Sequence, residues 1–119
     1  MSVMQAAHPG RLFDPGVDLV LTGHVHLFEA VSFSSDHPGN FVLGNAGSSM
    51  GWRIDPAKAM QAQPAPGAVV EHFSTQDGFG FATLDRVGQA WQLSEWDTHG
   101  RLLKSCAIQG AHLACEDAR

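Results

Sequence analysis

The run VDLVLT, residues 17–22, constrains the fold of this chain more than any other segment. It is a continuous and partly β-branched run, which is typical of a strand covered on both faces. Such a strand needs neighbouring strands and covering helices, and the sequence supplies almost no helix. We therefore expect residues 17–22 to belong to a larger sheet, whose other strands come from another chain or from the missing N-terminal half of the same domain.

The composition is that of an ordinary globular domain. The chain has 119 residues, 44% of them hydrophobic, which fits one domain and excludes a disordered or fibrous class. Its net charge is −5 with only seven Lys and Arg, so no basic surface for nucleic acid is indicated. No apolar stretch is long enough to be a membrane segment, and residues 1–13 lack the apolar region of a signal peptide.

The pattern along the chain predicts a mostly β fold of antiparallel hairpins with very little helix. Proline and glycine punctuate residues 1–16, which we expect to form a helix end and a loop. Residues 17–47 read as a strand followed by a hairpin that turns at residues 36–40 and pairs Ser34 with Phe41. Residues 48–67 read as a long loop. The closing antiparallel meander, residues 68–119, has strands expected at 68–74, 78–86, 90–98 and 102–109.

Two groups of side chains in the meander suggest further contacts. Four aromatic residues are expected to lie in the core: Phe79, Phe81, Trp91 and Trp96. A hairpin turning near Gly110 would bring Cys106 and Cys115 face to face, close enough for a disulfide in an oxidising compartment. The alternative is a pair of small, partly buried thiols. The cysteine pair favours export of the complete protein.

The segment GHVH, residues 23–26, carries the strongest chemical signal. In an extended segment His24 and His26 share one side, with Cβ atoms ~6–7 Å apart. Catalytic metal ions in pairs usually lie ~3.5–4 Å apart, so one imidazole for each ion is a good fit. Gly23 lets the backbone bend and approach a ligand. The alternative is a solvated loop with two incidental histidines.

Neighbouring polar residues could line such a site, but none of them is an anionic ligand. The expected hairpin pairing brings residue 26 near Ser48 and Ser49, and with Asn45 these could line the site or simply end a strand. Asp18 lies about 20 Å from His24 along a strand, and Glu29 is expected to face away. A dinuclear centre needs bridging carboxylates. The remaining histidines are expected to be structural or solvated: His37, His72, His99 and His112.

The segment GVDLVLTGHVHLFEA resembles the last metal-binding motif of the calcineurin-like metallophosphoesterases, a hydrophobic strand that ends in G-H-x-H. FVLGNAGSS looks like that family's next strand, and GFGFATLD with WQLSEWDTHGRLL is similar to its closing hairpins. The resemblance covers nearly the whole chain, and the strand with G-H-x-H is its most specific part. The resemblance implies that this chain forms the C-terminal part of a four-layer α/β/β/α sandwich.

The resemblance also implies a chemistry. His24 and His26 would each bind one of two divalent ions (Mn, Fe, Zn or Co), in a family that hydrolyses phosphate monoesters or diesters with a metal-bound hydroxide. The family's earlier motifs, D-x-H, G-D-x-x-D and G-N-H-D/E, are absent from this chain. His8 superficially resembles an upstream metal histidine. We therefore expect a hydrolase fragment that is inactive by itself.

Two other classes of function remain open. A cupin-like β-sandwich also uses H-x-H and a glutamate around one metal, although Glu29 follows His26 too closely for that motif. A non-catalytic β interaction fragment, with incidental histidines, is the other. These alternatives differ in the metal affinity that they predict.

Overall fold

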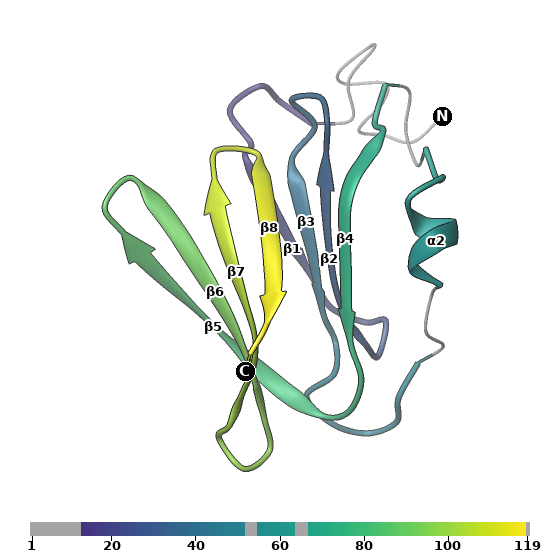
Figure 1. Ribbon diagram of the computed structural model, residues 1–119, viewed down its shortest axis with the longest axis vertical. Coiled ribbons are helices and arrows are strands. Elements are labelled where there is room, and N and C mark those ends of the chain that lie inside the picture. The colour runs from purple at the N-terminus through teal and green to yellow at the C-terminus, as the bar shows by residue number, and fades with distance from the viewer. Residues whose placement is uncertain (1–12, 52–54, 64–66, 119) are drawn as a thin grey trace.

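The protein is built mostly of β-strands arranged as two four-stranded sheets (Figure 1). The computed structural model describes residues 13–51, 55–63 and 67–118. In these ranges the elements are β1 (Leu19–Thr22), β2 (Phe28–Phe33), β3 (Gly39–Leu43), α2 (Pro56–Ala59), β4 (Val70–Gln76), β5 (Gly80–Val87), β6 (Ala90–Asp97), β7 (Leu102–Gln109) and β8 (His112–Asp117). Sheet A has the order β1-β3-β2-β4 and sheet B the order β5-β6-β7-β8. The predicted mostly β class is confirmed. His8 and most of the expected helix end lie outside the described residues.

One hydrophobic core lies between the two sheets. Phe28, Ala30 and Phe41 from sheet A pack against a group from sheet B that comprises Leu93, Cys106, Ile108 and Leu113. Within each strand these residues alternate with others, as expected when one face of a pleated strand is buried. A smaller cluster on the other face of sheet A contains Val31, Phe33, Ala68 and Val70. The short helix α2 lies beside β4 (Figure 1).

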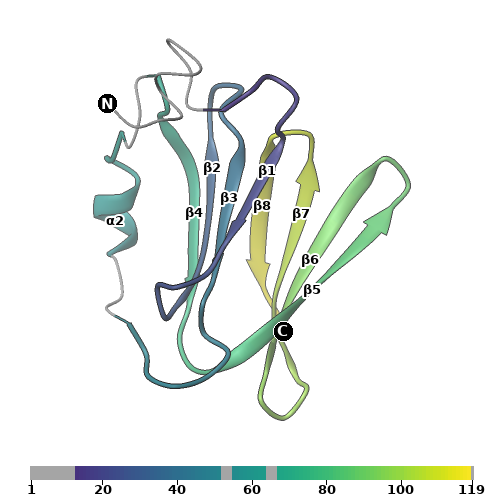
Figure 2. The same ribbon diagram turned by 180° about the vertical axis from the view of Figure 1, so that it is seen from behind.

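β1 is an edge strand rather than a strand covered on both faces. It pairs in parallel with β3, placing Leu21 opposite Phe41, and no described strand pairs with its other side. Leu19 packs against the core, whereas 49% of Leu21 is exposed. The expectation of complete burial is wrong for this chain, because β5 and β6 lean away from sheet A at this side (Figure 2).

The hairpin of β2 and β3 forms with a different register from the predicted one. Phe41 pairs with Ala30 rather than with Ser34. The chain leaves β2 after Phe33, whose ring lies 4.4 Å from the His37 ring, and His37 Nδ1 lies 3.1 Å from the Pro38 carbonyl oxygen. The turn therefore takes up residues 34–38 and shifts the pairing by four residues.

The closing meander is divided between the sheets. β4 pairs with β2 in sheet A, whereas β5 to β8 form sheet B as one antiparallel meander. A register irregularity at Ser32 and Phe33 interrupts the pairing of β2 with β4. Residues 68–76 thus complete the first sheet instead of opening the second.

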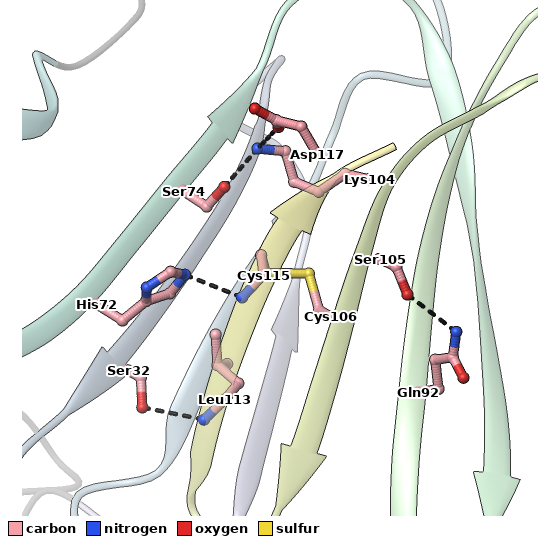
Figure 3. Close-up of a disulfide and its surroundings, with 10 residues drawn as sticks. All are labelled: Ser32, His72, Ser74, Gln92, Lys104, Ser105, Cys106, Leu113, Cys115 and Asp117. Carbon is pink, nitrogen blue, oxygen red and sulfur yellow. Dashed lines mark hydrogen bonds and ion pairs between the residues drawn. A yellow bond between two sulfur atoms is a disulfide. The ribbon is translucent and has the colours of Figure 1, made fainter. Parts of the chain in front are cut away.

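Polar contacts join the two sheets where β8 approaches β2 and β4 (Figure 3). Leu113 N donates to Ser32 Oγ at 3.0 Å, and Cys115 N donates to His72 Nε2 at 3.0 Å. Lys104 Nζ donates to Ser74 Oγ and forms an ion pair with Asp117. These contacts satisfy polar groups that are withdrawn from water at the junction.

The aromatic residues of the meander are more exposed than predicted. Phe79, Phe81 and Trp91 are 39%, 48% and 38% exposed, and Trp96 is half-buried. Phe81 stacks on Trp96 with ring centres 6.5 Å apart, and the Arg86 guanidinium lies 5.3 Å from the Trp91 ring. The core prediction for Phe79, Phe81 and Trp91 is wrong. Phe81 lies opposite Trp96, on the face of sheet B that points away from the core residue Leu93.

Candidate metal centre

The two histidines of the G-H-x-H segment lie at the carboxyl end of β1. Because β1 and β3 are parallel, the loop after each strand emerges at the same edge of sheet A. The loop of residues 23–27 and the loop of residues 44–51 meet at that edge, at the lower end of the molecule in Figure 2. Here we call them the histidine loop and the facing loop.

The histidine loop is a pair of consecutive tight turns instead of an extended segment. Val25 N donates to Gly23 O and Leu27 N donates to Val25 O, each at 2.9 Å, so each histidine is the central residue of a γ-turn. His24 has a φ of 73°, which makes its turn the rare and strained form. The expected extended geometry, from which a shared side was inferred, is therefore wrong. His24 is exposed and His26 is half-buried.

The facing loop holds the histidine loop by backbone and side-chain contacts. Gly51 N donates to His26 O, and Gly44 N donates to Leu27 O. Ser49 Oγ lies 3.2 Å from His26 Nδ1, which fixes one nitrogen of that ring. Ser48 has a φ of 71°; with His24 it is one of two non-glycine residues with a positive φ in the described part of the chain.

Glycine is required at residue 44 rather than at residue 23. A Cβ added at Gly44 would overlap the Val25 carbonyl oxygen, whereas a Cβ added at Gly23 would meet nothing within 4 Å. The close approach that the sequence predicts for Gly23 occurs at Gly44, where the facing loop passes against the histidine loop.

The described residues do not bring a third metal ligand to the two histidines. Within the described ranges no group of three His, Cys, Asp or Glu side chains is arranged to hold a metal ion. Glu29 alternates with the core residues Phe28 and Ala30 along β2, and burial raises its pKa.

Asn45 faces the core and not the histidines. It is 2% exposed, and its Nδ2 donates to Glu95 Oε1 at 2.5 Å and to Gly78 O at 3.3 Å. Glu95 is fully buried and its Oε2 has no hydrogen-bond partner. Burial raises the pKa of Glu95 to about 7, and the bond from Asn45 opposes that rise.

Sequence reasoning missed Glu95. The available signal was its position, two residues after the apolar Leu93 in a strand, where alternation points it inward.

The other candidate residues have structural positions. Cys106 and Cys115 lie opposite each other in β7 and β8 and form a disulfide with an S–S distance of 2.04 Å (Figure 3). His72 accepts the Cys115 amide, and His112 Nδ1 lies 2.8 Å from Glu71 Oε1. His99 is exposed in the turn between β6 and β7.

In the described ranges no helix is long and apolar enough to span a membrane. Searches against protein-family models, curated proteins and solved structures find no match for this chain.

Proposed function

We propose that this chain is the C-terminal part of a metallophosphoesterase domain and supplies two histidine ligands, His24 and His26, to a dinuclear metal centre. The carboxylates of that centre would come from the N-terminal part of the same domain. The substrate would be a phosphate monoester or diester. The observation that carries the proposal is the pair of γ-turns, which puts a histidine at the apex of each at the carboxyl end of a strand.

Backbone strain supports a functional role for the histidine loop. A non-glycine residue at positive φ costs about 1–3 kcal/mol and tends to occur where function requires it. The strained His24 and Ser48 lie in the two loops that contact each other. A solvated loop with incidental histidines gives no reason for strain at both places.

The open edge of sheet A supports a missing part of the domain. β1 has an unpaired side among the described strands, and the inward-facing Leu21 is half exposed beside it. Further strands along β1 would cover that side chain and extend the sheet towards the histidine loop. This arrangement is consistent with the sequence resemblance.

The residues fit part of a dinuclear centre. Shells that combine histidines with carboxylates accept Mn, Fe, Zn or Co, and Ser49 can orient the His26 ring as an outer partner. Two divalent ions, when bound, would activate water and neutralise charge on a phosphoryl group. This chain's own part is to present His24 and His26 at the edge of the sheet.

Metal binding by the 119-residue chain tests the ligand assignment. We expect Mn²⁺ to broaden the imidazole NMR signals of His24 and His26 before that of His99, with low affinity because two imidazoles cannot complete the coordination. His26→Ala and His24→Gly should abolish the preference, and His99→Ala should retain it. The variant His24→Gly also releases the strained φ, so its loss of binding would not reflect unfolding. Equal broadening of all exposed histidines would contradict the assignment.

Turnover tests the proposed reaction. The coding sequence upstream of Met1 should encode D-x-H, G-D-x-x-D and G-N-H-D/E, and the extended polypeptide should hydrolyse an aryl phosphate monoester or diester. We expect His24→Ala or His26→Ala to lower that turnover by about a hundredfold or more, beyond the 10–100-fold typical of outer partners. Chelation should abolish turnover and added Mn²⁺ should restore it. An upstream sequence without these motifs would overturn the proposal, and tight single-ion binding by the short chain would favour a cupin-like site.

A further inference from the structure

A buried contact between the sheets reaches the facing loop. Glu95 lies on β6 in sheet B and is fully buried. Its Oε1 accepts a hydrogen bond from Nδ2 of Asn45, which follows β3 in sheet A. Gly80 N donates to Asn45 O at 3.0 Å. A Cβ added at Gly80 would lie 2.8 Å from Glu95 Oε1, so β5 approaches this carboxyl closely. Asn45 is thus fixed through both its side chain and its backbone.

Asn45 adjoins the residues that hold the histidine loop. Gly44 N donates to Leu27 O, and four residues after Asn45 the Ser49 hydroxyl reaches His26 Nδ1. A displacement of Asn45 would therefore move the facing loop against the histidine loop. Glu95 is joined to His26 through this short chain of contacts, although it does not touch the ring.

The cost of burying Glu95 points to a specific role. A buried carboxyl with one unpartnered oxygen is unfavourable, and an apolar residue of similar size would fill the same space without that cost. The opposite residue on β7, Lys104, is also buried, but its ammonium group bonds to Ser74 and Asp117. Asn45 is the side chain that bonds to Glu95.

We propose that Glu95 is a positioning residue for the histidine loop: by holding Asn45 from across the core, it sets the facing loop that orients His26. The metal-binding consequence rests on the proposed function, whereas the orientation of the His26 ring does not. Glu95 lies in sheet B and His26 in the loop after β1 of sheet A, so this role would link the closing meander to the candidate site.

Three variants of the full chain separate positioning from general stability. Glu95→Leu fills the space but removes the acceptor, Glu95→Gln keeps an acceptor oxygen, and Lys104→Met removes a buried charge that does not contact Asn45. Two quantities are measured for each variant. The first is the NOE between the His26 ring and the Ser49 β-protons, and the second is the Mn²⁺ concentration that produces half of the maximal broadening of the His26 signal. Circular dichroism verifies that each variant is folded.

We expect Glu95→Leu to lose the NOE and to need about tenfold more Mn²⁺, a loss typical of removing an outer partner of a metal-ligating histidine. Glu95→Gln and Lys104→Met should behave as the unmodified chain. A folded Glu95→Leu variant that keeps the NOE would overturn the positioning role. Should Mn²⁺ fail to affect His26 in the unmodified chain, the metal proposal fails, and the NOE alone still decides whether Glu95 positions the ring.

Discussion

At the scale of single residues, the chain carries unfavourable features at two connected places. His24 and Ser48 have strained backbone, and Glu95 is a buried carboxyl with an unpartnered oxygen. Each costs folding free energy that a different residue would not cost. These residues lie close together along the chain of contacts: His24 and Ser48 are in the two loops that contact each other, and Glu95 bonds to Asn45 in the facing loop.

Glu95 gives the folding stability a defined dependence on pH. Its pKa is about 7 in the folded protein against an ordinary value of 4.5, so between these values the folded state holds a proton that the unfolded state has released. Stability due to Glu95 is complete below pH 4.5 and is lost as the pH rises to 7 and above. The expected loss is about 3 kcal/mol.

Urea unfolding at pH 4.5 and at pH 8 measures this effect. The Glu95→Gln variant should not lose this stability as the pH rises. The control variant replaces Glu116, an exposed glutamate on β8; Glu116→Gln should lose as much stability as the unmodified chain. Parallel pH profiles of the unmodified chain and Glu95→Gln would contradict the prediction.

At the scale of elements, the loops after β1 and β3 depend on one close approach. Gly44→Ala would drive a Cβ into the Val25 carbonyl oxygen, so the histidine loop must shift. We expect a loss of about 1–3 kcal/mol in the free energy of unfolding, together with a changed His26 NMR signal. Chemical denaturation and the imidazole spectrum measure the two effects.

Gly47→Ala is the matched control in the same loop. A Cβ at Gly47 would meet nothing within 4 Å, so its effect should stay within about 0.5 kcal/mol. If both variants lost the same stability, the contact between Gly44 and Val25 would not be the cause.

Local pattern predicted the strands well and their partners poorly. Alternation and turn residues located the strands of the chain, but the register of the β2–β3 hairpin depended on how Phe33, His37 and Pro38 pack in its turn. The contact of His26 with Ser49 was expected from the wrong register and arises instead because the facing loop turns back. The parallel pairing of β1 with β3 has no local signal, since β2 lies between these two strands in the sequence.

The candidate site shows the same division between local and long-range information. The histidine pair was visible as a motif, whereas the γ-turns and the bond between Asn45 and Glu95 arise from packing between distant segments. The only sequence feature that could have indicated a role for Glu95 was its position as a charged residue on the inward side of a strand.

At the scale of the whole molecule, acid should loosen the junction between the sheets. The Nε2 atom of His72 must be unprotonated to accept the hydrogen bond from the Cys115 amide. Burial, and after it the charge of Lys104, lowers the pKa of His72. The folded state therefore binds fewer protons than the unfolded state. Stability from His72 is present above its ordinary pKa of 6.5 and is lost as the pH falls below that value.

Unfolding measured between pH 5 and pH 7 tests the role of His72. His72→Gln should remove the acid-side loss, and His99→Gln, in an exposed turn, should leave it unchanged. Because Glu95 acts in the opposite direction, the double variant His72→Gln, Glu95→Gln should have the flattest profile. An acid-side loss that persists in His72→Gln would assign the effect to another group.

The amide groups at the outer margin of β8 have a consequence for assembly. Those of Leu113 and Cys115 already donate to Ser32 and His72 across the junction, so an incoming strand would find these two donors occupied. β1 has no comparable protection among the described residues. Of these two edges, β8 is therefore the less open to an added strand, whereas β1 offers its outer margin on the side of the histidines.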